Sequence, residues 1–436
     1  MATVVQPTLA KPAPRFWSSW RFGPGLVHLL GSIGPNDLVV NCVAGATYGY
    51  SLLWFLPVAY SLNYLICEAA SRYVLVTGET IVEGFGRLGK PIVFLLAFAI
   101  FVRRHLNNLY TVLLLGTAAH LLVPLPVLRS QMIWSLVSFT FAFTLMLRGG
   151  YPGVERFSRG CLALLMGSLV VVTVLARPSL SAVFSGLLIP SFPGDRGVYS
   201  HVLVLMAVAG TTVGSINHLK YPAYVYEKGW RSVQEFKKQR VDLALCVVGQ
   251  CLLAVLIQIA SAATLYGQGV ELRSLEDLSR VFSGPLGATG RVALGIGMWC
   301  SVLMSYVGSN TGYSLIVADI YERFVHRRAA GPLVESRDAR RRRAYRFVLV
   351  FFCVSPLYVV FTSWEPFALG LVTSALFLVL TPLLLGGLLR LTNDRFLLNG
   401  ATNGLSSRIG LGAAMAVSMY LTYSGAVELI GTIGAR

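Results

Sequence analysis

The sequence predicts an all-α integral membrane protein with two inverted repeats of five helices, an eleventh helix outside them, and breaks in the first and sixth helices. Three observations support this fold class. Of the 436 residues, 55% are hydrophobic and only 13% are charged, about half the charged fraction of a typical soluble protein. The hydrophobic residues form successive blocks of about twenty, the length of a membrane-spanning helix. Two of these blocks, at corresponding places in the two halves, are interrupted by glycine, proline and polar residues.

Composition and motifs exclude several classes of protein. Polar residues are too few to cover a water-facing globule, which excludes an ordinary cytosolic enzyme and a disordered chain. The seven cysteines lie mostly in apolar runs without a CxxC pair, so we expect them to be reduced. The chain has no complete GxxxxGK[ST] phosphate loop and no HExxH zinc pattern. We therefore expect neither an enzyme nor an ATP-driven pump, and no cofactor.

Eleven membrane helices can be placed along the chain, and an odd number leaves the two termini on opposite sides of the membrane. Residues 1–22 contain Pro7, Pro12 and Pro14 and no long apolar core, so they are expected to form a cytoplasmic tail without a cleavable signal. The first repeat is expected to cover residues 23–197 and the second 198–390, followed by a loop and the last helix in 391–436. The predicted spans are residues 24–46, 51–76, 91–123, 131–147, 161–176, 200–226, 242–266, 286–320, 345–362, 366–389 and 407–430.

The net charge of +17 is explained by the positions of the 36 Lys and Arg residues. With the N-terminus in the cytoplasm, most of them fall in predicted cytoplasmic stretches, in agreement with the positive-inside rule. The C-terminus is then outside, and the short loops favour a bacterial inner membrane. The densest basic run, residues 340–343, is expected to orient its neighbouring helices and to attract anionic lipid. No nucleic-acid partner is expected.

The two broken helices are the main functional signal. The first reads LVHLLGSIGPNDLVVNCVAG and is interrupted at residues 31–37, and the sixth reads VAGTTVGSINHLKYPAYVY and is interrupted at residues 210–217. Such residues cannot continue a stable lipid-facing helix. Two discontinuous helices in matching positions of antiparallel halves are typical of a transporter that binds its substrate near the bilayer midplane.

Residues at both breaks are candidates for substrate binding. Unwound main chain exposes amides and carbonyls, and an ionisable side chain within the membrane indicates a functional site. Asp37 could instead cap the second half-helix, and Asn36, Thr211 and Asn217 could satisfy unwound backbone. The candidate substrate-binding residues are Asp37, Asn36, Gly34, Thr211, Gly214 and Asn217.

The third helix carries a second group of polar residues. Arg104, Asn108 and Thr111 recur at helical spacing and predict a stripe that faces protein or water rather than lipid. Arg103 and Arg104 could bind a substrate, or they could pair structurally with Glu68 of the second helix or with each other's neighbours.

Lys220 follows the second break by one turn. It could neutralise Asp37, bind a substrate carboxylate or extend towards the cytoplasm. His105 and His218 could respond to pH near neutrality or serve as hydrogen-bonded interior residues. The candidates for a pathway or coupling role are Arg103, Arg104, His105, Asn108, His218 and Lys220.

Four segments, GPGLVHLLGSIGPND, AGATYGYSLLW, VTGE and GLLIPSFPG, together resemble the natural-resistance-associated macrophage protein (Nramp) family of metal-ion transporters. The resemblance extends from about residue 23 through the tenth helix. It implies a LeuT-type fold and alternating access. Members of the family generally couple the uptake of divalent transition metals to protons.

The ligand motifs depart from that family. Its first broken helix carries Asp-Pro-Gly-Asn where this chain has GPND at residues 34–37, and its sixth carries Met-Pro-His-Asn where this chain has GSIN at 214–217. Loss of the methionine thioether removes the bias towards soft transition metals. If the substrate is a cation, the resemblance implies an all-oxygen, singly charged site of Asp37, Asn36, Thr211 and Asn217, with Asp37, Thr211 and Asn217 as the metal ligands, suited to a hard, partly hydrated ion.

The third helix departs further from the family. Its acidic residues correspond here to Phe98, His105 and Asn108, beside two arginines, so proton movement by that route is not expected. Positive charge beside a cation pathway disfavours a dication by roughly several kcal/mol unless an acidic group screens it. The same charge suits a solute that carries a carboxylate.

The expected function is secondary transport. On the resemblance, the substrate is a hard divalent cation such as Mg²⁺ or hydrated Mn²⁺. The residues alone leave open a second substrate class, a small zwitterionic or carboxylated organic solute bound by half-helix amides, Asp37 and the nearby cations. A third class is a receptor or scaffold that kept the fold and lost transport. The expected partners are the solute and the lipid bilayer.

Overall fold

The structure of the chain is a computed structural model. All regular secondary structure among its described residues is helical. The described residues are 23–32, 34–127, 129–148, 150–194, 200–268, 275–325, 334–362, 364, 369, 373 and 378–434. The predicted N-terminal tail lies outside them. So do the side chains of some helical residues, including Asn36, Ser215 and Arg340.

The first half of the chain begins with the predicted broken helix. Its two parts are α1 (Pro24–Ser32) and α2 (Pro35–Tyr48). A bend of 117° separates α7 from α8, and Gly186 of α8 lies so close to Tyr50 that a Cβ would be 2.3 Å from the Tyr50 carbonyl oxygen. Therefore α8 crosses the connection between α2 and α3. The other helices of this half are α3 (Phe55–Thr77), α4 (Ile81–Leu88), α5 (Lys90–Leu122), α6 (Ser130–Arg148), α7 (Gly150–Leu175) and α8 (Leu180–Leu188).

The second half begins with the second broken helix. It consists of α9 (His201–Thr212), the 3₁₀ turn η1 (Ser215–Leu219) and α10 (Lys220–Lys228). The long helix α12 is kinked at Gly287, whose φ of 59° favours glycine. The remaining elements are η2 (Val233–Glu235), α11 (Phe236–Leu265), α12 (Leu275–Ile320), η3 (Tyr321–Val325), α13 (Val334–Val354), η4 (Leu357–Phe361), α15 (Thr381–Asn393) and α16 (Leu405–Gly434).

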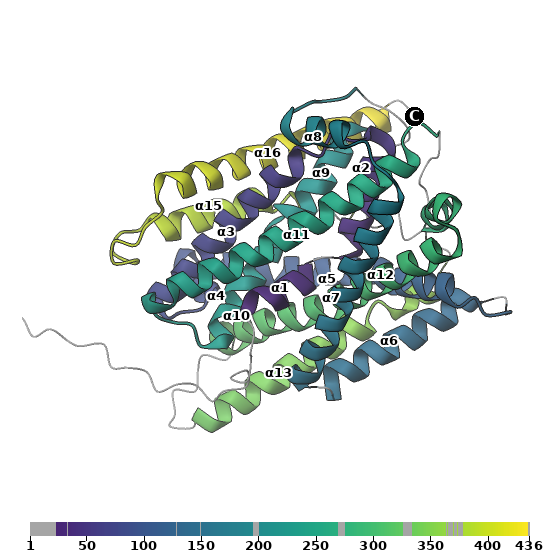
Figure 1. The fold of residues 1–436 in the computed structure, drawn as a ribbon. Coiled ribbons are helices and arrows are strands. Elements are labelled where there is room, and N and C mark those ends of the chain that lie inside the picture. The colour runs from purple at the N-terminus through teal and green to yellow at the C-terminus, as the bar shows by residue number, and fades with distance from the viewer. Residues whose placement is uncertain are drawn as a thin grey trace, which may run out of the picture.

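Small residues let the broken helices pack closely against their neighbours. In the helical bundle of Figure 1, α11 packs against α2 and α3, and α12 packs against α5, α7 and α1. A Cβ on Gly45 of α2 would lie 2.5 Å from the carbonyl oxygen of Gln258 in α11. The hydroxyl of Ser261 donates to the carbonyl of Cys42 across the same contact, at 2.7 Å. Such close contacts are typical of helix pairs in membranes, where van der Waals packing replaces the hydrophobic effect.

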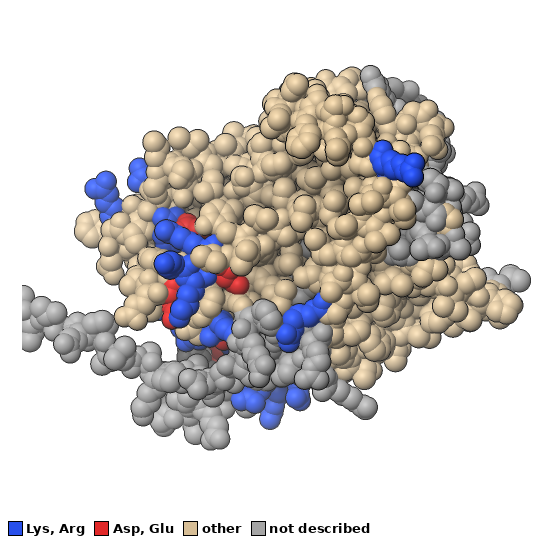
Figure 2. All heavy atoms as spheres, in the orientation of Figure 1, with Lys and Arg blue, Asp and Glu red and all other residues tan. Residues whose placement is uncertain are grey.

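The outer surface fits a bilayer. Five helices in the described part of the chain are long and apolar enough to cross a membrane, and six if α7 and α8 are one bent span. Large apolar side chains such as Phe98 and Leu188 are 66% and 76% exposed. In Figure 2 most charged side chains on the visible face gather at one end of the bundle, where α4, α10 and α13 lie, and few charged side chains lie on the rest of that face. The predicted spans overlap the observed helices, but α7, α12 and α13 each begin 11 residues before the predicted start, and the tenth span is described mainly over α15.

Candidate functional site

The first break places a buried carboxylate at the start of α2. Gly34 precedes the helix with extended backbone, and Pro35 occupies the first turn, where a proline removes no helical hydrogen bond. The Asp37 carboxylate is buried, and its Oδ2 accepts a hydrogen bond from the Gly34 amide at 2.9 Å. Asp37 therefore caps the half-helix, one of the two roles considered for it. Its role towards a substrate stays a prediction.

The second break follows the end of α9 directly. The amides of Val213 and Gly214 both donate to the carbonyl of Ala209, at 2.7 and 2.9 Å, and the chain then continues as the 3₁₀ turn η1. In η1, Asn217 is held by α12, because the Tyr313 hydroxyl donates to Asn217 Oδ1 at 2.7 Å. The amide oxygen of Asn217 is therefore engaged by a neighbouring helix in this conformation.

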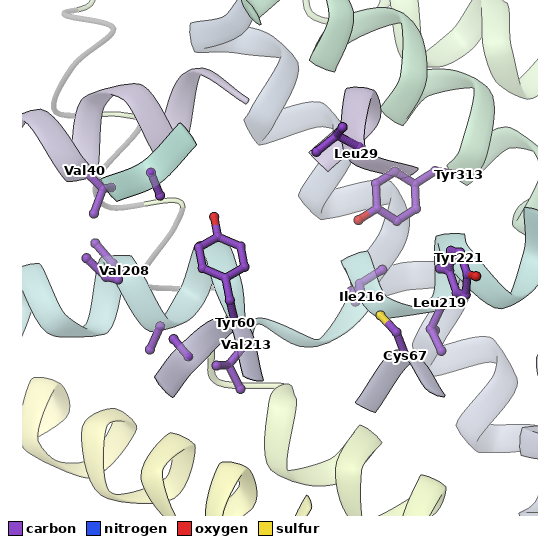
Figure 3. Packing of buried hydrophobic residues seen from close by; sticks show 14 of the residues in the cluster. Leu29, Val40, Tyr60, Cys67, Val208, Val213, Ile216, Leu219, Tyr221 and Tyr313 are labelled. Atoms are coloured by element: carbon purple, nitrogen blue, oxygen red, sulfur yellow. The ribbon is translucent and has the colours of Figure 1, made fainter. Parts of the chain in front are cut away.

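The two breaks meet. The Thr211 side chain, in the last turn of α9, lies beside the Asp37 carboxylate at the start of α2, and its hydroxyl donates to the Val208 carbonyl at 3.0 Å. Around this contact, α2 packs against α9, and α3 packs against η1. Figure 3 shows the apolar side chains that surround the breaks, with Tyr60 and Cys67 from α3, Ile216 from η1 and Tyr313 from α12. The polar turns of the first and sixth helices therefore form one buried junction, as predicted.

The junction offers oxygen atoms as ligands. Asp37 brings a carboxylate and Thr211 a hydroxyl to this junction, whereas the amide oxygen of Asn217 accepts a hydrogen bond from Tyr313 of α12. The described residues contain no group of three or more His, Cys, Asp and Glu side chains that could hold a metal ion. A cation bound here would therefore have one charged ligand and would keep part of its water shell, as hard cations do. The side chain of Asn36, a fourth predicted ligand, lies outside the described part of the chain.

The whole Lys220 side chain, including its charged ammonium group, lies in the protein interior. Its side chain is fully buried, and its Nζ donates to the carbonyl of Gly31 in α1 at 2.7 Å and to the hydroxyl of Ser309 in α12 at 3.1 Å. It also interacts electrostatically with Asp37. The extended conformation towards the cytoplasm, one of the three considered for Lys220, is therefore wrong.

The polar stripe on α5 faces the protein interior, as predicted. Arg104, Asn108 and Thr111 are all buried. The Arg104 guanidinium donates to Asn108 Oδ1 and, at 2.9 Å, to Asn310 Oδ1 in α12. Asn108 in turn donates to Asn310 Oδ1 at 2.9 Å and to the Phe352 carbonyl at 2.7 Å. Arg104 is thus held by neutral amides that join α5, α12 and α13.

The pairing of Arg104 with Glu68, one of the alternatives considered, is wrong. Glu68 pairs instead with Arg72 at 3.1 Å and with Arg240 of α11 at 3.0 Å. Arg103 is also buried and interacts electrostatically with Lys220.

The two candidate histidines lie in different surroundings. His105 is half-buried on the outer side of α5, with Nδ1 3.2 Å from the Ser355 hydroxyl and Nε2 3.2 Å from the Tyr358 hydroxyl. This places it away from the junction of the breaks. His218 is buried in η1, close enough to His28 of α1 to interact with it electrostatically.

Sequence reasoning missed two residues on neighbouring helices that form hydrogen bonds with the broken helices. Tyr313 binds Asn217 and lies beneath two cations, with its ring centroid 5.6 Å from Arg104 Cζ and 5.3 Å from Lys220 Nζ. Asp242 of α11 holds the start of α1, because its Oδ2 accepts hydrogen bonds from the Gly25 amide at 2.6 Å and the Tyr221 hydroxyl at 3.0 Å. The glycines of GSNTGY at residues 308–313 were the available signal for a close helix contact on α12.

Comparison with known proteins identifies the family. The family model described as natural resistance-associated macrophage protein-like (Nramp) matches residues 25–428. The chain belongs to the Nramp family. A relative in this family is the divalent metal cation transporter MntH of Aeromonas hydrophila, which is 26% identical over 311 residues, covering 70% of this chain and 74% of the relative.

Solved structures confirm the LeuT-type fold of this Nramp chain. The manganese transporter of Eremococcus coleocola, solved with an aromatic bis-isothiourea compound, superposes with a TM-score of 0.71 at 16% identity, covering 92% of this chain and 86% of that one. MhsT in complex with L-phenylalanine superposes with a TM-score of 0.54 at 14% identity, covering 93% of this chain and 97% of that one. At these identities the likeness concerns the fold alone.

Proposed function

We propose that this Nramp-family chain is a secondary transporter that works by alternating access and binds its substrate where the two broken helices meet. The observation that carries this proposal is the packing of α9 against α2, which places Thr211 beside the Asp37 carboxylate and brings together the ends of two half-helices from opposite halves of the chain. Half-helix ends direct partial charges and unpaired backbone groups into one buried place. Because α1 and α10 are short half-helices, they can move without unfolding a whole span.

The substrate class that the relatives support is a divalent cation. The MntH relative and the E. coleocola protein carry divalent cation and manganese in their names. The proposed ligands are Asp37, Thr211 and Asn217, all through oxygen, and Gly214 supplies no thioether. We therefore propose a hard, partly hydrated cation such as Mg²⁺ or Mn²⁺. We further propose that protons are not coupled through carboxylates on α5, since Arg104 and Asn108 occupy its buried face.

A second candidate is a small organic solute that carries a carboxylate. It is favoured by the buried Lys220 and Arg104, whose hydrogen-bond acceptors among the described residues are neutral. At a separation of about 5 Å and an effective dielectric constant of about 20, each such cation repels a dication by about 7 kcal/mol. L-Phenylalanine, the compound bound in the structure of MhsT, belongs to this class of solute.

Measurements of binding and transport with the Asp37→Asn variant distinguish a cation substrate from an organic one. The matched control is Asp394→Asn, which makes the same change at an exposed loop carboxylate. If the substrate is a cation, calorimetry with Mn²⁺ or Mg²⁺ should detect binding to the wild type and to Asp394→Asn, and none to Asp37→Asn. Uptake of the same ion into proteoliposomes should follow the same pattern.

Other outcomes would change the conclusion. Absence of heat with either metal, together with thermal stabilisation by an amino acid or organic acid, would support the organic solute and contradict the cation. No binding and no uptake of either class would contradict transport itself and support a receptor or scaffold. A proton flux that rises and falls with substrate uptake would contradict the proposal on α5.

We propose that the end with α4, α10 and α13 faces the cytoplasm, because charged residues gather there (Figure 2) and the positive-inside rule places them inside. The C-terminus is then outside, the membrane is a bacterial inner membrane, and anionic lipid is a partner of the basic residues. The proposed repeats are residues 23–197 and 198–390.

A further inference from the structure

The end of α1 is held by donors from two other helices. The carbonyl of Gly31, one residue before the last residue of α1, accepts hydrogen bonds from Lys220 Nζ at 2.7 Å and from the Ser309 hydroxyl at 2.7 Å. Lys220 Nζ also lies 3.1 Å from the Ser309 oxygen. The three groups therefore form a closed triangle that joins α1, α10 and α12.

This arrangement puts a cation where the first half-helix needs one. The last carbonyls of a helix have no intrahelical partner, and the helix dipole places partial negative charge there. An amine at this end satisfies a carbonyl and interacts favourably with the dipole. Because α1 stops inside the protein, a cation must come from within the fold or from a bound ion.

The α12 segment at 308–313 is shaped to receive the Lys220 side chain. A Cβ on Gly312 would lie 2.3 Å from the Tyr224 hydroxyl and 3.2 Å from Lys220 Cδ, so glycine leaves room for both side chains of α10. Lys220 Nζ lies over the Tyr313 ring, 5.3 Å from the ring centroid, where a cation–π interaction is favourable. Gly31 packs directly against Gly308, and a Cβ on Gly31 would be 3.2 Å from the Gly308 carbonyl carbon.

We propose that the Lys220 ammonium is a tethered cation that locks α1 against α10 and α12, in a place that a free monovalent cation could otherwise occupy. This inference rests on the proposed alternating-access function and adds a positioning residue to it. With the cation supplied by the chain, α1 is held in this conformation without a bound ion such as Na⁺. Movement of α1 during transport then requires Lys220 to leave Gly31 and Ser309.

Cation rescue of Lys220→Ala tests the proposal without any substrate. Thermal unfolding of the purified full chain is measured in ethylammonium chloride, NaCl or choline chloride at equal ionic strength. The wild-type midpoint should be the same in all three salts. Lys220→Ala should unfold several degrees lower in choline chloride and recover in ethylammonium or Na⁺, because these ions fit the vacated place and choline is too large. The control Lys238→Ala removes a lysine that is 69% exposed and should behave as the wild type.

A second variant reports on α1 itself. Lys220→Met keeps an aliphatic side chain but removes the charge, so no cation should rescue it. In a Cys251→Ser background, which removes the one native cysteine that is not fully buried, a maleimide should label the Ser32→Cys variant several-fold faster when Lys220→Met is also present. An unchanged labelling rate, or a midpoint of Lys220→Ala that is the same in the three salts, would overturn the proposal. Both readouts are independent of substrate, so they separate a failed lock from a failed assignment of transport.

Discussion

Gly214 illustrates how strongly single residues determine the second break. It lies two residues after the end of α9, and a Cβ there would lie 1.8 Å from the carbonyl oxygen of Gly210. The chain therefore turns at 214 only because no side chain is present. This position corresponds to the methionine in the family motif, so a thioether cannot be restored there without moving the backbone.

Gly214→Ala should lower the thermal midpoint, because the new methyl group forces the turn away from Gly210. Overpacking of this kind costs about 1–3 kcal/mol. The control is Gly412→Ala in α16, where the structure has open space within 4 Å of the added Cβ and alanine favours the helix by about 1 kcal/mol over glycine. Its midpoint should match or exceed that of the wild type. Thermal unfolding in detergent measures both, and equal midpoints for the two variants would contradict the predicted clash.

At the scale of elements, hydrogen bonds at both ends stabilise the short helix α4. The loop helix α4 begins at a capping box, in which the Thr80 hydroxyl accepts from the Glu83 amide at 3.3 Å and Glu83 Oε2 accepts from the Thr80 amide at 2.9 Å. The other end of α4 is held by Arg87, whose Nε donates to Glu79 Oε2 at 3.0 Å. Tyr73 at the end of α3 donates to the same oxygen at 2.6 Å. Glu79 therefore connects α3 to α4.

This connection should make stability depend on pH. Burial raises the pKa of Glu79, but hydrogen bonds from Arg87 and Tyr73 outweigh it, and the net pKa lies below that of an ordinary glutamate. A lowered pKa means that Glu79 stabilises the fold above about pH 5 and that this contribution is lost as the pH falls below about 4. Glu79→Gln should therefore lower the thermal midpoint at pH 7, and the difference from the wild type should shrink as the pH falls.

The control for this prediction is Glu235→Gln. It removes the same charge from an i,i+3 ion pair with Lys238, at 3.1 Å on the surface, and such pairs contribute little. A difference between Glu79→Gln and wild type that stays constant from pH 7 to about pH 3.5 would contradict the assigned role of the carboxylate.

At the scale of the whole molecule, a network of ion pairs closes the charged end of the bundle. Arg341 of α13 pairs with Glu227 of α10 and lies 3.7 Å from Asp319 of α12. Arg323 of η3 pairs with Asp319 at 2.9 Å and with Glu83 of α4. The network therefore ties α10, the last part of the second broken helix, to elements outside that helix, and α10 must separate from them if this end opens.

Arg341→Gln should loosen this end of the molecule. Glu227 would lose its ion pair with α13, so α10 should separate more readily and its amides should exchange faster. Hydrogen–deuterium exchange of α10 and η3 measures the effect. Arg343→Gln makes the same change at an exposed arginine two residues away and should leave exchange unchanged. Equal exchange in the two variants would show that the network does not hold the end closed.

The sequence alone determined the membrane location, the helical spans, the two breaks and the family. These features depend on local properties: apolar blocks of bilayer length, and glycine and proline that end a helix wherever it packs. It also identified Asp37, Thr211 and the buried stripe of Arg104 and Asn108.

Only the tertiary structure decided what these side chains bind. Lys220 reaches Gly31, which is 189 residues away in the chain, and Tyr313 reaches Asn217, which is 96 residues away. Glu68 pairs with Arg72 and Arg240 rather than with Arg104. A buried polar group takes whichever partner the packed helices bring to it, and that choice depends on how distant segments meet rather than on the residues beside it.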